Sequence, residues 1–390
     1  MNSLCTDVGY LSINKYGEQL CGDHVEIAEG DDHSLVLVLA DGLGSGVKAN
    51  ILSTLTAKII STMMANHMSI ENCVTTVAST LPVCEKRGIA YSTFTIIHVI
   101  DNKTAEIIQY DNPHVILLRN GVHLDYDMVS LQIGDKNIFQ SKIDLLPGDV
   151  LVAMSDGAVY AGVGKTFNFG WQRQNIIDFL EIIYDNSHSS KMVSSLLLEQ
   201  CANLYGGTPG DDTTIAAVKI RKREQINLLI GPPADPKDLN RMMSSFFKKD
   251  GKRIVCGGTT SSLAASYLGK EIKTALEYKT SDIPPIAYIE GIDLVTEGVI
   301  TVNRVLHYAK NYLEDNAFDM QWSYREDAAS SIAKLLFEDA TDINFYVGRA
   351  MNPAHQNPNL PISFSIKMRL IEELSDCLRK MGKQINVQYF

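Results

Sequence analysis

The run Leu35–Ala40 (LVLVLA) constrains this chain most, because six consecutive apolar residues indicate a buried strand. Asp41 follows directly, and glycines alternate with other residues up to Gly46. From Val47 to Met64 the apolar period becomes helical, with one stripe formed by Leu52, Leu55, Ile59 and Met63. We therefore expect a buried strand that carries an aspartate at its end, then a tight turn, and then a helix that packs through this stripe.

Two turn signals in the first 220 residues indicate antiparallel strands. The turn 101–104 lies between apolar segments at 91–100 and 105–109. Asn120-Gly121, a strong hairpin signal, lies between 115–119 and 122–124. We also predict strands at 150–154 and 213–220 and helices at 70–86, 174–184 and 191–203. Hairpins with helices clustered between them predict an α+β fold of stacked antiparallel sheets covered by helices.

The pattern changes after the basic cluster at 219–223, which we interpret as a solvated linker. We predict one domain at 1–222 and a smaller C-terminal α/β domain at 226–390, with strands and helices in alternation. Within it, Gly257–Ser261 follows a strand and opens a helix. This segment is either a tight turn with a Thr or Ser cap, or an anion cradle without the lysine of a nucleotide-binding P-loop.

Charge and cysteine content narrow the functional classes. The formal charge is −11, and residues 1–225 contain 26 acidic and 16 basic residues, so we expect no nucleic-acid partner. The N-terminus lacks the pattern of a signal peptide, and the strongest apolar run is far shorter than the ~20 residues of a membrane helix. The seven cysteines form no CxxC pair. We therefore expect a cytoplasmic protein without a membrane segment or a disulfide framework.

Five aspartates lie where strands end or turns begin. They are Asp23, Asp41, Asp156, Asp211 and Asp212. A single Asp-Gly at a strand end is usually only a turn. Several such ends together can bring oxygen ligands to divalent cations, and aspartates without His or Cys partners favour Mg²⁺ or Mn²⁺ over Zn²⁺.

The order of these motifs resembles a known family. It runs G-D at 22–23, A-D-G-x-G-x-G at 40–46, D-N-P-H at 111–114, S-D-G at 155–157 and G-D-D-T-T at 210–214. It is similar to the metal-dependent protein serine/threonine phosphatases, in the bacterial branch typified by the phosphatase domain of stage II sporulation protein E. The resemblance covers about residues 5–220, and it implies an αββα sandwich of two antiparallel sheets flanked by helices.

The resemblance also implies roles for individual residues and a cofactor of two Mn²⁺ or Mg²⁺ ions. Asp41 would bridge both ions, with the Gly42 carbonyl at the first, and Asp156 and Asp211 would hold the second. Asp23 would act mainly through metal-bound water, so Asp41 and Asp23 are the catalytic candidates. Beyond the ligands, Asp212 would support the site or form a turn, and His114 is a candidate in a loop where family members carry a histidine.

A hydroxide activated by the two ions would attack phosphoserine or phosphothreonine in a protein substrate. The resemblance suggests a bacterial signalling pathway and an anti-sigma antagonist type of phosphoprotein; whether the chain is a monomer or a homodimer stays open. Residues 1–47 contain no arginine, which many eukaryotic relatives use to hold phosphate, and Lys15 is their only basic residue apart from histidine. Phosphate binding would then depend on the metals alone or on a group from another segment. Two other functions stay open: a metal-dependent scaffold or phosphopeptide-binding module without turnover, and a C-terminal nucleotide- or anion-binding domain as the main active unit.

Overall fold

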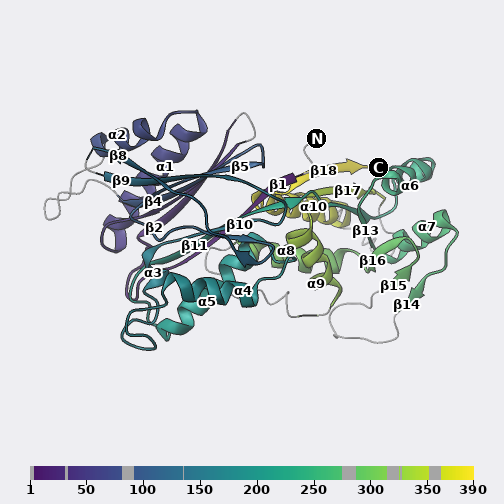
Figure 1. Cartoon of the computed structure of the whole chain (residues 1–390). Coiled ribbons are helices and arrows are strands. Elements are labelled where there is room, and N and C mark those ends of the chain that lie inside the picture. Colours follow the sequence, from purple (N-terminus) through teal and green to yellow (C-terminus); the bar gives the residue numbers. More distant parts are fainter. Residues whose placement is uncertain are drawn as a thin grey trace. The chain divides into compact units, whose positions relative to one another are not determined.

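A computed structural model describes residues 4–30, 34–80, 92–134, 136–274, 287–313, 325, 327–350 and 362–390. The chain divides into two compact units, Met1–Lys222 and Arg223–Phe390. Each unit is described by itself below, with the labels of Figure 1.

Two antiparallel sheets form the centre of the first unit. In one sheet the strand order is β1 (Leu4–Ile13), β11 (Thr213–Lys222), β10 (Val150–Met154), β6 (Ile116–Arg119) and β7 (Val122–His123). In the other it is β2 (Asp23–Glu29), β3 (Leu35–Asp41), β4 (Thr93–Ile100), β5 (Thr104–Tyr110), β9 (Lys136–Asp144) and β8 (Val129–Ile133). β3 has neighbours on both sides, as the apolar run at 35–40 predicts.

The two sheets pack against each other through apolar side chains. Leu37 and Leu39 of β3 are fully buried in one cluster with Leu151 of β10 and Val218 of β11. The helix α1 (Gly46–Ala65) contacts β2 and β3, whereas α5 (Ser190–Tyr205) contacts β1 and β11. Figure 1 shows α1 and α2 (Ile70–Thr80) on one side of the sheets, and α3 (Asp156–Val159), α4 (Arg173–Ile183) and α5 on the other. The predicted αββα sandwich is confirmed.

Both predicted hairpins are present. Asp101 and Asn102, between β4 and β5, have φ values of 53° and 56°, and Asn120 and Gly121, between β6 and β7, have 54° and 80°. Asp, Asn and Gly tolerate this left-handed region, so turn chemistry alone identified these connections. Of the helix predicted at 70–86, residues 81–86 lie outside the described residues, as does Tyr91.

The stripe predicted for α1 is only partly correct. The buried face consists mostly of small residues, including Ala49, Ser53 and Ala57, while Leu55 is 43% exposed. The reason is the close approach of the helix to the turn that precedes it, since a Cβ on Gly42 would lie 2.1 Å from the Ala49 carbonyl oxygen. Small side chains fit this contact, and the larger aliphatic residues Val47, Ile51 and Leu55 are therefore on the exposed side.

The second unit contains one seven-stranded sheet. Its order is β14 (Lys273–Thr274), β15 (Ala287–Ile289), β16 (Ile292–Thr296), β13 (Lys252–Cys256), β12 (Gln225–Ile230), β17 (Asp342–Val347) and β18 (Gln384–Tyr389). The five strands from β16 to β18 are parallel, and β14 and β15 form an antiparallel edge. The chain proceeds from β12 to one side of the sheet and returns to the other side with β17, which is a doubly wound arrangement.

The helices of this unit are α6 (Leu239–Lys248), α7 (Gly258–Leu268), α8 (Val299–Leu313), α9 (Ala328–Ala333) and α10 (Ile362–Lys380). Phe246 of α6 and Ala264 of α7 pack in one core cluster with Val255 and Tyr346 of the sheet. α8 contacts both α9 and α10. α9 continues into a π-helical turn at Lys334–Asp339. The predicted C-terminal α/β fold is confirmed.

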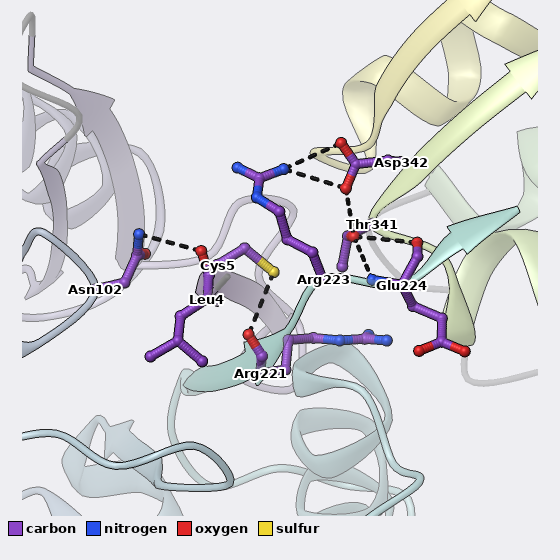
Figure 2. Close-up of polar contacts among 8 residues, drawn as sticks. All are labelled: Leu4, Cys5, Asn102, Arg221, Arg223, Glu224, Thr341 and Asp342. Atoms are coloured by element: carbon purple, nitrogen blue, oxygen red, sulfur yellow. Dashed lines mark hydrogen bonds and ion pairs between the residues drawn. The ribbon is translucent and has the colours of Figure 1, made fainter. Parts of the chain in front are cut away.

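The residues on either side of the boundary between the units make polar contacts, and each contact lies within one unit (Figure 2). In the first unit the Cys5 thiol lies 3.7 Å from the carbonyl oxygen of Arg221, near the end of β11. In the second, Arg223 Nη1 lies 3.1 Å from Asp342 Oδ1, and the Glu224 amide donates to Thr341 Oγ1 at 2.8 Å. β11 ends at Lys222 and β12 begins at Gln225, so the connection is two residues long.

No helix in the described part of the chain combines the length and the apolar character that a membrane crossing requires.

Candidate metal centre

Strand pairing in the sheet that contains β2 and β3 brings Asp23 and Asp41 together. Asp23 begins β2, Asp41 ends β3, and the two residues are direct partners in the antiparallel register. The next strand, β4, places Thr93 opposite Asp41. The backbone amide of Gly42 donates to the Gly22 carbonyl at 3.1 Å, so the ends of β2 and β3 are joined beyond the aspartates.

The sheet that contains β10 and β11 supplies Asp156, Asp211 and Asp212. β10 and β11 are antiparallel neighbours, and Asp156 follows the end of β10 while the other two precede the start of β11. The pairing continues past the strand, because the Ser155 amide donates to the Thr214 carbonyl and the Thr214 amide donates to Ser155 Oγ. A Cβ on Gly157 would lie 2.1 Å from the Asp212 carbonyl oxygen, so this close approach requires glycine.

The carboxylate of Asp41 interacts with those of both sheets. Burial raises its pKa to about 9, and the nearby charges of Asp23, Asp156 and Asp211 contribute to the rise. Burial likewise raises the pKa of Asp23 to about 7, to which Asp212 and Asp156 add. The hydroxyls of Ser155 and Thr214 lower the Asp23 pKa, although neither reaches hydrogen-bonding geometry. The predicted residues Asp23, Asp41, Asp156 and Asp211 therefore lie in one site.

The site contains more negative charge than its surroundings compensate. Asp23 is 4% exposed, and both of its carboxylate oxygens are buried without a hydrogen-bond partner. Oδ2 of Asp212 is likewise buried without a hydrogen-bond partner, whereas its Oδ1 accepts a hydrogen bond from the Lys15 amide at 3.0 Å. Burial also raises the pKa of Asp156, and the Asp211 charge adds to this effect. Buried carboxylates without partners cost free energy unless they are protonated or bind a cation.

The donor set fits divalent cations with oxygen ligands. It offers carboxylate oxygens and the Gly42 carbonyl, without imidazole or thiolate ligands among the predicted residues. Among the described residues, no three His, Cys, Asp or Glu side chains already converge on one ion position. Both carboxylate oxygens of Asp23 are free of hydrogen bonds and could serve as ligands of such a cation.

Lys15 belongs to the site, although the sequence analysis did not include it among the site residues. Lys15 Nζ lies 3.6 Å from Asp211 Oδ1, and its charge lowers the pKa of Asp156. Lys15 lies in the β1–β2 connection, and the amide of the following residue, Tyr16, donates to the Pro209 carbonyl at 2.9 Å. Its position as the only basic residue other than histidine in residues 1–47 was the signal that could have identified it.

His114 lies in a structural environment. Its ring packs edge-on against Phe139 with centroids 5.4 Å apart, and its carbonyl accepts from Arg173 Nε at 2.9 Å. Burial lowers the pKa of His114, and the Arg173 charge lowers it further. None of these contacts within the described residues is with the five aspartates, so the structure gives His114 no observed link to the site.

Comparison with known families identifies the domain that contains these residues. The family model described as "Stage II sporulation protein E (SpoIIE)" matches residues 31–221. The chain therefore contains a SpoIIE-type phosphatase domain. Stage II sporulation protein E of Bacillus subtilis (strain 168) is 23% identical over 212 residues, which cover 53% of this chain and 24% of that protein. The chain thus matches about a quarter of the length of this curated relative.

Solved structures resemble the fold. The phosphatase domain of Bacillus subtilis SpoIIE with a fragment of its regulatory domain is 20% identical, with a TM-score of 0.49, and covers 57% of this chain and 65% of that chain. The RsbU and RsbW domains of Rv1364c from Mycobacterium tuberculosis are 13% identical, with a TM-score of 0.50, and cover 83% of this chain and 79% of theirs. RsbX, crystallised in complex with magnesium, is 17% identical, with a TM-score of 0.38, and covers 55% of this chain and 95% of that chain.

Proposed function

We propose that the first unit is a Mn²⁺- or Mg²⁺-dependent phosphatase that removes phosphate from phosphoserine or phosphothreonine in a protein. The observation that carries this proposal is the cluster of Asp23, Asp41, Asp156 and Asp211. Its carboxylates come from two sheets, and the oxygens of Asp23 are buried without partners. The membership of this region in the SpoIIE family supports the same activity.

Each residue would then have a defined task. Asp41 is the cross-strand partner of Asp23, and the charges of Asp156 and Asp211 from the other sheet raise its pKa, so Asp41 would bridge two ions. The Gly42 carbonyl would join Asp41, Asp156 and Asp211 would hold the second ion, and Asp23 would orient water. Two bound ions would lower the pKa of a water molecule and neutralise charge on the phosphoryl group. Asp212, which accepts the Lys15 amide, would hold the loop that carries Asp211.

The names of similar proteins bear on the substrate. RsbU, RsbW and RsbX appear by name among the similar structures, and one relative is described as a cell fate determinant. We propose a bacterial signalling phosphoprotein of the anti-sigma antagonist type, in the cytoplasm.

Hydrolysis of p-nitrophenyl phosphate and of a phosphoserine peptide by the purified chain tests the proposal. We expect turnover with Mn²⁺ or Mg²⁺, loss of turnover in excess EDTA, and recovery when metal is added back. Asp211→Ala should remove the activity, because Asp211 would be a ligand of the second ion. Full turnover in EDTA would contradict the mechanism. Metal binding without turnover of any phosphoester would favour the scaffold or phosphopeptide-binding alternative.

The second unit offers a second candidate function, the binding of a nucleotide or another anion. From β12 the chain first adds strands on one side of the sheet and later, with β17, on the other side. Sheets with such a change of side bind ligands there, beyond the carboxyl ends of the strands. There Gly257 has φ 108°, and a Cβ on Gly258 would meet open space at the start of α7. Thr260 Oγ1 instead accepts the Gly231 amide, so it serves the fold. A melting temperature of the full chain that ATP, GTP and phosphate leave unchanged would count against this candidate.

A further inference from the structure

The β1–β2 connection brings a lysine to a site otherwise made of carboxylates. Lys15 forms an ion pair with Asp211, and within the described residues it is the only cation paired with any of the five aspartates. Backbone contacts fix its position at both ends of the residue. Its amide donates to Asp212 Oδ1 at 3.0 Å, and its carbonyl accepts the Glu18 amide at 3.0 Å. Ser45 Oγ donates to Glu18 Oε1 at 3.1 Å, so the same connection also contacts the start of α1.

The side chain of Lys15 is held much more weakly than its backbone. Nζ lies 3.6 Å from Asp211 Oδ1, beyond the usual length of a charged hydrogen bond, and the two side chains are 37% and 42% exposed. A half-exposed pair of this kind contributes little stability. The ammonium can therefore exchange Asp211 for another anion at small cost, while the backbone keeps it beside the site.

We propose that Lys15 positions the phosphate of the substrate by binding one of its oxygens. This inference rests on the proposed function. When Asp211 serves as a metal ligand, its carboxylate is no longer available to Lys15, and the ammonium becomes free at the edge of the site. A phosphate monoester is a dianion, and the other groups around it here are carboxylates, so a single fixed cation would orient it.

The competing explanation is that Lys15 only reduces the repulsion between Asp211 and its neighbours. In that case loss of the lysine would alter metal affinity, and phosphate affinity would follow only through the metal. The two roles are separable because inorganic phosphate can be titrated into the metal-loaded protein without turnover, and Mn²⁺ binding can be measured without phosphate.

The test uses the full chain and the variants Lys15→Met and Lys15→Arg. Lys58→Met is the matched control, because Lys58 pairs with Glu26 at 2.8 Å, away from the five aspartates. Calorimetry measures the Kd of Mn²⁺ alone and then of inorganic phosphate at saturating Mn²⁺. We expect Lys15→Met to weaken phosphate binding about tenfold, to change the Mn²⁺ Kd less than about twofold, and to raise KM more than it lowers kcat. Lys15→Arg should keep most of the phosphate affinity, and Lys58→Met should behave as wild type.

Three results would overturn the inference. One is an unchanged phosphate Kd in Lys15→Met, another is an equal loss of Mn²⁺ and phosphate affinity, and the third is no phosphate binding by the Mn²⁺-loaded wild type. Equal melting temperatures of the variants and the wild type guard against a folding defect, and Lys15→Arg tests the role again if Lys15→Met unfolds. Lysine-dependent phosphate binding without phosphoester turnover would reject the proposed function and keep this inference.

Discussion

Two sets of cross-strand polar side chains, one in each unit, differ in their hydrogen bonding. In the second unit, Asn227, Asn344 and Asn386 lie opposite one another on β12, β17 and β18. Asn344 donates to Asn227 at 3.0 Å and Asn386 donates to Asn344 at 3.3 Å, so the row of amides bonds to itself. In the first unit, Asp23 and Asp41 are also direct cross-strand partners, but both are carboxylates and neither oxygen of Asp23 has a partner.

The amides satisfy one another within the sheet, whereas the carboxylates are the groups that we propose to bind metal. Paired amides within a sheet contribute to stability without any further component. Adjacent buried carboxylates oppose folding when they are ionised, and a proton or a bound cation would offset this cost. Perturbed pKa values that arise from burial and like charge are typical of functional sites for this reason.

The substitution Asp41→Asn should have the largest effect. It keeps the size of the side chain and removes the charge that would bridge the metals. Loss of a residue that only hydrogen-bonds a metal ligand costs about 10–100-fold, so we expect the loss of the ligand itself to lower metal-dependent turnover more than about 100-fold. The metal-free protein should become more stable at pH 8, since Asn removes the cost of protonating Asp41 on folding, whose pKa rises to about 9 in the folded state. Turnover assays and thermal melts in EDTA measure the two effects.

Asp149→Asn is the control for this prediction. Asp149 is also a buried aspartate of the first unit, 1% exposed, but Arg119 donates to both of its oxygens at 2.9 and 2.7 Å. Its substitution should lower the melting temperature and leave turnover per folded molecule unchanged. A stability loss in Asp41→Asn similar to that in Asp149→Asn would mean that Asp41 has a structural role.

Asn344→Ala should break the row of amides in the second unit. It leaves Asn227 Oδ1 and Asn386 Nδ2 without their partner, which should lower the free energy of unfolding by about 1–3 kcal/mol. Urea denaturation measures this loss. The Kd of Mn²⁺ should stay unchanged, because the aspartate cluster belongs to the first unit; a weaker Kd would show that the two regions are coupled.

The parts of the fold that could be predicted from sequence are those with local signals. The apolar run of β3 and the Asn120-Gly121 turn each identify their own structure. β1 could not be predicted, because its mixed sequence LCTDVGYLSI becomes a strand through its partner β11, some 200 residues later in the chain. Similarly, the buried face of α1 follows from its contact with Gly42 and not from its own apolar period.

The candidate site shows the same division. The five aspartates could be selected from the sequence because the order of their motifs resembles a known family, since a strand end or a turn alone does not distinguish them. That Asp23 and Asp41 face each other depends on the register of β2 and β3, and the position of Lys15 depends on a connection that crosses to Asp211 and Asp212. Non-local pairing therefore determines which predicted residues meet.

The stability of the metal-free protein should depend on pH through the site in the first unit. The pKa of Asp41 rises from 3.8 to about 9 on folding and that of Asp23 from 3.8 to about 7. A folded state that binds protons more tightly than the unfolded state loses stability as pH rises between the two pKa values. The contribution of Asp23 and Asp41 should thus lower the melting temperature in EDTA as the pH rises from about 4 towards 9. Asp41→Asn should reduce this slope, and an identical slope in wild type and variant would contradict the assignment.

The smallest effect should come from Leu55→Ser in α1 of the first unit, for which Phe246→Ala in α6 of the second unit is the reference. Phe246 of α6 is fully buried, so Phe246→Ala should cost about 3–5 kcal/mol. Leu55 of α1 is 43% exposed, so Leu55→Ser should change the free energy of unfolding by less than about 0.5 kcal/mol, although the apolar period of α1 alone predicts it to be buried. Urea denaturation of both variants at low and high protein concentration measures the contrast. A cost above about 2 kcal/mol for Leu55→Ser that grows with concentration would mean that a second copy covers this side of α1, because the loss of contacts within a monomer does not depend on concentration.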